Sequence, residues 1–266
     1  MNPPALVAVA HGSRDGRSAA AVAALAAATR AQARRLDLRL SFLDFNAPAL
    51  PTVLRAVAAD GHRTVIVVPL LLNTAYHARV DLPAAVAAAL HGLPRLRVAV
   101  SEVLGAAPSD LLDAVWDRLR EAGADPADPR LGVVLAAAGA SDPAANAAVA
   151  RLAATRPRTV AAFAAAARPD VPEALARLRA QGATRFAVAP WFLAPGRLLD
   201  RVRAAARATD PAVVLAEPLG SHRRVAAAVL ERYRAAGRTL WRERVGLPLS
   251  PTLWLHNVPA THVPSM

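Results

Sequence analysis

Two histidines and one aspartate follow three successive apolar segments at equal spacing along the chain. His11, Asp44 and His77 stand 33 residues apart, which is about the length of one strand and its following helix in an alternating α/β chain. The spacing therefore predicts that all three polar side chains lie at or just beyond the carboxyl ends of strands. The preceding apolar segments are residues 5–10, 38–43 and 64–72.

These residue types suit a metal site. In an open parallel sheet, ligands bind outside the carboxyl ends of the strands, and neighbouring strands lie ~4.8 Å apart. If the strand order is 2-1-3, Asp44 and His77 flank His11. Two imidazoles and a carboxylate then form an open site for a divalent transition metal, and an imidazole also accepts a proton near neutral pH.

Each of the three residues also has an ordinary structural interpretation. A histidine after a strand is commonly a loop residue, and an aspartate there forms an Asx turn or caps the next helix. His77 fits a helix start, with Asp81 as a first-turn acid. The coincidence at three successive strand ends favours the metal site.

The segments between these residues predict the elements that hold them. Apolar strand-like segments alternate with alanine-rich helical ones, and residues 65–68 are all β-branched. Four strand–helix units fit within about 120 residues. This alternation predicts an α/β fold in which helices flank a doubly wound, four-stranded parallel sheet.

The second half of the chain repeats the pattern of the first. Residues 131–142 match residues 5–15, and residues 182–193 match residues 61–72. The sequence thus predicts two homologous lobes with a cleft between them. The expected bounds are 1–124 for the catalytic lobe, 130–240 for a degenerate lobe and 241–266 for an irregular tail.

The polar residues of the first lobe have apolar counterparts in the second. The glycines and prolines of the scaffold persist between the two halves, whereas the candidate ligands do not. We therefore expect the first lobe to carry the chemistry and the second to wall the cleft. The pairs are His11 with Ala138 and Asp44 with Ala165. His77 pairs with Leu198, but the length of the loop before Leu198 leaves this last pairing open.

Composition excludes several classes of site. The chain has no cysteine, so disulfides, thiol nucleophiles and cysteine-ligated clusters are excluded. All 32 basic residues are arginines, which excludes a catalytic lysine, and the net charge of +12 attracts anions. No uncharged apolar stretch reaches the ~18 residues that a membrane span needs, so we expect a soluble cytoplasmic protein without a membrane partner.

The motifs around these residues resemble the CbiX/SirB family of class II tetrapyrrole chelatases. The resemblance covers the chain to about Gly237 and includes a second half of this type. Its motifs are His11-Gly12-Ser13-Arg14, Phe42-Leu43-Asp44, Val67-Val68-Pro69-Leu70-Leu71 and His77-Ala78-Arg79-Val80-Asp81-Leu82-Pro83.

The resemblance implies insertion of Fe²⁺ or Co²⁺ into sirohydrochlorin without ATP or an organic cofactor, on the route to siroheme or cobalamin. His11 and His77 match the family's metal-binding and proton-accepting histidines. Asp44 stands where the family usually has glutamate, which retracts the carboxylate by about one methylene.

The substrate that the resemblance implies carries eight carboxylates. Ser13, Arg14 and Arg79 are the residues we expect to bind it, with Arg197 as a further candidate. The alternative interpretation is that each arginine is an ordinary surface residue surrounded by solvent.

Two other functions compete with catalysis. A metal or tetrapyrrole carrier without turnover is motivated by Asp44 in place of glutamate. A nucleic-acid-binding protein is motivated by the net charge alone, and an aromatic content of only 4% argues against it. We expect a monomer that binds no nucleic acid. His222, at a strand end of the second lobe, is a further residue that could face the cleft.

Overall fold

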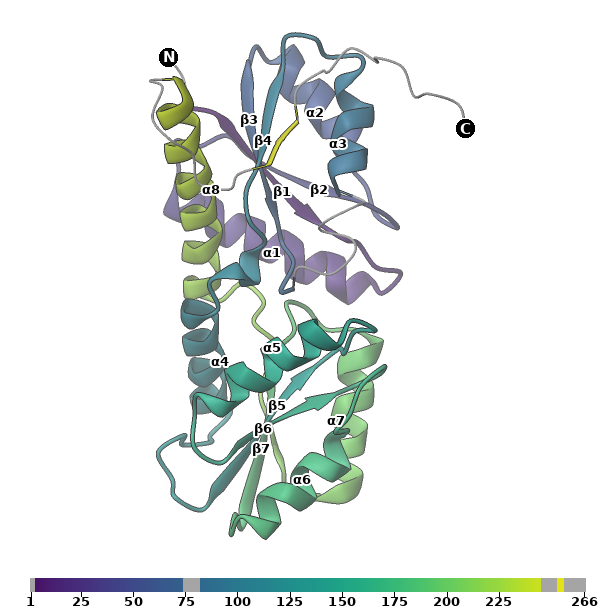
Figure 1. Cartoon of the computed structure of the whole chain (residues 1–266), viewed down its shortest axis with the longest axis vertical. Helices are drawn as coiled ribbons and strands as arrows, with labels where there is room; N and C mark the ends of the chain where they lie inside the picture. The colour runs from purple at the N-terminus through teal and green to yellow at the C-terminus, as the bar shows by residue number, and fades with distance from the viewer. Residues whose placement is uncertain (1–2, 74–81, 245–252, 256–266) are drawn as a thin grey trace.

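The chain folds into two α/β lobes, one above the other in Figure 1. The computed structural model describes residues 3–73, 82–244 and 253–255. Each lobe contains four parallel strands flanked by helices, so the predicted fold class is confirmed. None of the helices in the described part is long and apolar enough to cross a membrane.

The first sheet has the order β2-β1-β3-β4-β9, so β1 lies between β2 and β3, the arrangement on which the predicted grouping of the three polar residues depends. Ala10 pairs with Phe42 and Val9 with Pro69, which brings the carboxyl ends of the three strands to one edge. Each side chain of β1 is buried, as expected for a parallel strand covered on both faces. The strands are β1 (Ala5–Ala10), β2 (Leu38–Phe42), β3 (Thr64–Pro69), β4 (Arg97–Val100) and the antiparallel β9 (Leu253–Leu255).

The second sheet repeats this order as β6-β5-β7-β8. Its central strand is again buried throughout. In each lobe, a loop of the same type therefore follows the carboxyl end of the central strand. The strands are β5 (Leu131–Ala137), β6 (Thr159–Phe163), β7 (Arg185–Pro190) and β8 (Val214–Leu215).

Helices cover both faces of each sheet. One face of the first sheet packs on α2 and α3, and one face of the second packs on α6 and α7. The remaining faces pack on α1 and α5 and on the two helices that end the lobes along the chain, α4 and α8. The helices are α1 (Gly16–Gln32), α2 (Leu50–Ala59), α3 (Leu82–Leu90), α4 (Ser109–Glu121), α5 (Pro143–Ala154), α6 (Val171–Ala180), α7 (Arg197–Thr209) and α8 (Arg223–Arg244), with a short 3₁₀ turn at Leu104–Ala106.

The last helix of each half packs on the other half. Helix α4 contacts β7 of the second sheet, whereas α8 contacts α1, β3 and β4 of the first. Figure 1 shows α8 beside the upper lobe and α4 beside the lower one. Trp116 of α4 and Val229 of α8 belong to one buried cluster that includes Ile66 and Leu135, so a single core runs through both lobes.

The packing of α4 and α8 on the opposite lobes affects the predicted division of the chain into two lobes. The boundaries at 1–124 and 130–240 stay a prediction of where the sequence divides, but each sheet is completed by a helix from the other side of that division. Part of the tail is regular rather than irregular: α8 reaches Arg244, and Leu253–Leu255 adds an antiparallel edge strand to β4. A strand of three residues is too short to show the alternation of apolar and polar residues that predicts a strand.

Candidate functional site

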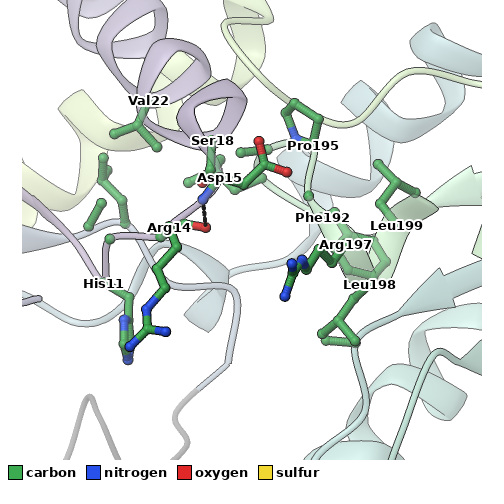
Figure 2. Close-up of a pocket in the computed structure, with 18 of the residues that line it drawn as sticks. His11, Arg14, Asp15, Ser18, Val22, Phe192, Pro195, Arg197, Leu198 and Leu199 are labelled. Atoms are coloured by element: carbon green, nitrogen blue, oxygen red, sulfur yellow. Dashed lines mark hydrogen bonds between the residues drawn. The ribbon is translucent and has the colours of Figure 1, made fainter. Parts of the chain in front are cut away.

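A cleft of about 800 Å³ lies between the lobes. Its upper wall comes from the loop after β1, the start of α1 and the end of β3. Its lower wall comes from Ala138 and from the segment between β7 and the first turn of α7. Figure 2 shows His11 and Arg14 on one side of the opening, with Arg197 and Leu198 on the other. The cleft therefore forms where both sheets end, the place expected for a ligand.

His11 directly follows β1 and lines this cleft. Its ring is partly buried and stacks on the ring of Phe45, with centroids 6.2 Å apart and planes 18° from parallel. The neutral imidazole offers a nitrogen lone pair to a metal or a proton. His11 is thus held at the strand end by backbone on one side and by an aromatic ring on another.

A close backbone contact joins the loop of His11 to that of Asp44. The Asp44 amide donates to the His11 carbonyl at 2.9 Å. Gly12 has φ +97°, and a β-carbon there would lie 1.8 Å from the Asp44 carbonyl oxygen. Only glycine combines that conformation with so close an approach.

The second lobe contains the same junction without the polar side chains. The Ala165 amide donates to the Ala138 carbonyl at 3.0 Å, and Gly139 repeats the φ and the close approach of Gly12. The predicted pairing of His11 with Ala138 therefore holds in space. The junction is scaffold, whereas the imidazole is present in the first lobe only.

Asp44 is exposed, and its Oδ1 accepts the Phe45 amide at 2.8 Å. That bond goes to the next residue, whereas an Asx turn engages the amide two residues on, so it is not the turn considered from the sequence. The residue is next to His11 through the backbone but is not among the residues lining the cleft.

Ser13 organises the loop it belongs to. Its amide donates to Asn46 Oδ1 at 2.8 Å, and its Oγ accepts the Asp15 amide at 3.0 Å. Asp15 in turn caps α1 by accepting the Arg17 amide. Ser13 lines the cleft, so its hydroxyl is near any ligand while it also fixes the approach to α1.

Arginines stand on both walls of the cleft. Arg14 is exposed on the upper wall, with its guanidinium carbon 5.2 Å from the centroid of the Phe45 ring. Arg197, at the first turn of α7, lines the lower wall. Two guanidinium groups facing one space favour an anionic ligand.

Two of the predicted site residues, His77 and Arg79, lie outside the described residues. Within the described part of the chain, no group of three or more His, Cys, Asp or Glu side chains is arranged to hold a metal. The convergence of His11, Asp44 and His77 on one ion therefore stays a prediction.

The prediction that His222 could face the cleft is wrong. His222 is buried at the start of α8, where its Nδ1 accepts the Arg224 amide and its Nε2 lies 3.6 Å from Asp117 of α4. The helix exchange puts it between α4 and α8, an arrangement that strand order alone does not reveal.

Three features of the site were not predicted from sequence. They are the aromatic ring of Phe45 against His11, the amide of Asn46 that holds the Ser13 loop, and the exposed Leu198 on the facing wall. An aromatic residue directly after Asp44 was the available signal for the first. The other two depend on contacts between distant segments.

The fold and cleft define a class of two-lobed α/β proteins with a cleft between the carboxyl ends of two similar sheets. The family model named CbiX matches residues 5–122 and 132–236. The chain belongs to the CbiX family, as the resemblance in its motifs indicated.

Individual relatives agree with this assignment. The chain is 29% identical over 240 residues to the sirohydrochlorin ferrochelatase of Bacillus subtilis, covering 86% of this chain and 90% of that one. It is 27% identical over 169 residues to the sirohydrochlorin cobaltochelatase of Priestia megaterium, covering 60% of this chain and 55% of that one.

A solved structure of SirB from Bacillus subtilis with Fe³⁺ superposes with a TM-score of 0.75 at 25% identity, over 93% of this chain and 99% of that one. A cobalt complex of the sirohydrochlorin chelatase SirB from Bacillus subtilis subspecies spizizenii gives 0.70 at 27% identity, over 89% and 96%.

Proposed function

We propose that this protein inserts Fe²⁺ or Co²⁺ into sirohydrochlorin, with the metal as a substrate and without an organic cofactor. The observation that carries the proposal is His11, which lines an anion-attracting cleft in a member of the CbiX family. Relatives named as ferrochelatase and cobaltochelatase support both metals. The product belongs to the siroheme or cobalamin route.

The reaction exchanges two protons for one metal ion. Two pyrrole N–H bonds break, their electron pairs bind the divalent cation, and two protons leave. His11 lies at the cleft wall as a weak metal ligand that can also accept a proton. In the proposal His77 shares these two tasks, and the Asp44 carboxylate assists from the neighbouring loop.

Charge on the cleft walls orients the substrate. Arg14 above and Arg197 below can pair with carboxylates on the rim of the macrocycle while its centre faces His11. Ser13 contributes a hydroxyl, and Arg79 is a further proposed partner. Both walls come from one chain, which supports action as a monomer, and we propose a cytoplasmic location.

The choice of metal is a separate part of the proposal. A nitrogen and oxygen site binds Co²⁺ more tightly than Fe²⁺ according to the general order of divalent metals. We therefore expect both ions to be inserted in vitro and supply in the cell to decide between them.

Metalation of sirohydrochlorin, followed by its absorbance with Fe²⁺ or Co²⁺, tests the proposal. Wild-type protein should accelerate the change, and His11→Ala should lose at least a hundredfold of that rate because general acid–base groups contribute about 10²–10⁴. His91→Ala is the matched control, since His91 is exposed just after α3, where its ring hydrogen-bonds to the Ala87 carbonyl, and it does not line the cleft. Equal rates for wild type and His11→Ala would contradict the proposal.

A carrier without turnover is the second candidate. The bond from the Phe45 amide to Asp44 Oδ1 favours it, because a carboxylate so engaged is less available to the cleft. Tight binding of the macrocycle without faster metalation is the result that would support this function instead.

A further inference from the structure

Two large apolar side chains are exposed in the described part of the chain: Leu198 lines the cleft, and Phe45 stacks on His11, which lines it. Phe45 is 50% exposed and Leu198 is 36% exposed. Phe45 follows β2 in the upper lobe, and Leu198 lies in the first turn of α7 in the lower one. Exposed apolar groups that gather at one cleft indicate contact with an apolar surface of a ligand.

Phe45 is tied to the reactive edge of the upper lobe. Its ring stacks on His11 and lies under the guanidinium of Arg14. The ring therefore borders two residues that line the cleft, although Phe45 itself is not among the lining residues. The contact also places an apolar surface directly beside a positive charge.

Leu198 provides the same combination on the facing wall. It follows Arg197, and both residues line the cleft. Figure 2 shows Leu198 and Arg197 across the opening from His11 and Arg14. On each side of the opening, one exposed apolar side chain thus lies next to an arginine that lines the cleft.

The aromatic ring of Phe45 is not required by the backbone. Phe45 has φ +59°, a left-handed conformation unfavourable for a residue with a β-carbon. Ala166, at the equivalent point of the second lobe, adopts φ +60° with a methyl group alone. The junction folds without an aromatic ring, so the ring of Phe45 has another role.

Resting on the proposed function, we propose that Phe45 and Leu198 are specificity-determining residues that hold the conjugated ring of the macrocycle between the two walls. A flat apolar ring with carboxylates on its rim matches apolar side chains flanked by arginines on both sides. The contacts fix the plane of the ring next to His11, while Arg14 and Arg197 bind the rim.

Binding of metal-free sirohydrochlorin, measured by its fluorescence, tests this inference without requiring turnover. Phe45→Ala, which copies the residue of the second lobe, and Leu198→Ala should each weaken binding about tenfold, equivalent to about 1.4 kcal/mol. Phe45→Tyr should restore near wild-type affinity because it keeps the ring. Thermal unfolding of each variant checks that the fold is intact.

A flexible aliphatic tetracarboxylate serves as a second probe, with competition against sirohydrochlorin as the measurement. It can pair with the arginines but offers no flat ring. Its affinity should be unchanged by Phe45→Ala and lowered by Arg14→Gln. Equal losses for both probes in Phe45→Ala would show that the ring acts only by orienting Arg14, and would overturn the inference.

The outcomes separate this inference from the proposed function. Unchanged sirohydrochlorin affinity in both alanine variants overturns the inference and leaves metalation standing. Binding that depends on Phe45 and Leu198 without faster metalation supports the inference and rejects catalysis. Absence of macrocycle binding by the wild-type protein rejects both.

Discussion

Arg17 of α1 and Asp200 of α7 join the two lobes beside the cleft by paired hydrogen bonds of 3.2 and 2.6 Å. The same guanidinium also binds Asp15, the residue that caps α1. Its hydrogen bonds hold the pKa of both carboxyl groups below the ordinary value. One cation therefore offsets a carboxylate from each lobe where an anionic ligand would enter.

Arg17→Gln should raise the KM for sirohydrochlorin severalfold with little change in kcat. The substitution leaves two uncompensated carboxylates at the cleft edge, which repel a polycarboxylate substrate. Steady-state metalation rates at several salt concentrations measure this, and the effect should shrink at high salt because exposed charges are screened.

Arg17→Gln combined with Asp200→Asn is the matched control for that prediction. The double variant has the same local charge as wild type but no ion pair between the lobes. Recovery of KM would support the charge explanation. A KM as high as in Arg17→Gln alone would show instead that the bridge itself sets the width of the cleft.

Gly12→Ala and Gly139→Ala form a second matched pair. Each β-carbon would lie 1.8 Å from a carbonyl oxygen, of Asp44 or Ala165 respectively, at a positive φ. We expect each variant to lose roughly 3 kcal/mol of unfolding free energy, measured by urea denaturation. Only Gly12→Ala should also abolish metalation, since it displaces the loops of His11 and Asp44. Equal activity in the two folded variants would argue against chemistry in the first lobe.

Asp44 offers a test of side-chain length. Asp44→Ala should lower the metalation rate at least tenfold if the carboxylate assists proton transfer, whereas Asp44→Glu, one methylene longer, should keep at least the wild-type rate. Asp60→Ala removes an exposed carboxylate at the end of α2, remote from the cleft, and serves as the control. A wild-type metalation rate in Asp44→Ala would show that the role of Asp44 is confined to its hydrogen bond with the Phe45 amide.

His222 predicts a pH dependence of stability that is independent of catalysis. Burial lowers the pKa of His222, as does the charge of Arg118, while Asp117 and Glu121 oppose the shift. Because the folded-state pKa lies below the unfolded value of about 6.5, the unfolded chain binds more protons between the two values. Stability from this group is present above about pH 6.5 and is lost as the pH falls through this range.

His222→Asn should therefore flatten the fall in stability as the pH drops below about 6.5, as measured by urea midpoints. Its Oδ1 can still accept the amide that now bonds to His222 Nδ1, as asparagine does at helix starts. An unchanged pH slope in this variant would mean that other groups cause the acid sensitivity.

Local patterns of residue types in the sequence predicted many of the strands and helices of each lobe. The four β-branched residues at 65–68 lie within β3, and the apolar segments at 5–10 and 38–43 contain β1 and β2. The pairing of His11 with Ala138 was also predicted correctly, and the order 2-1-3, assumed for the site, is the one observed. These features depend on periodicity and repetition, which a sequence displays directly.

The candidate site was predictable only in part. His11, Ser13 and Arg14 are recognisable in the sequence because they follow a strand and match a motif, and Arg197 is recognisable from its place in the second lobe. The roles of Phe45, Asn46 and Leu198 arise from contacts made after the loops fold back on one another. Nothing in the spacing of these residues indicates such contacts.

By itself, the sequence determined the alternation of strands and helices, the repetition of the lobe and the residue types at the end of the first strand, because hydrophobic period and turn chemistry act over a few neighbours. Tertiary structure decided that α4 and α8 cross to opposite sheets, that Arg17 meets Asp200 and that His222 is buried away from the cleft. These outcomes depend on which apolar faces bury one another across more than a hundred residues, a choice made by packing of the whole chain rather than by any segment.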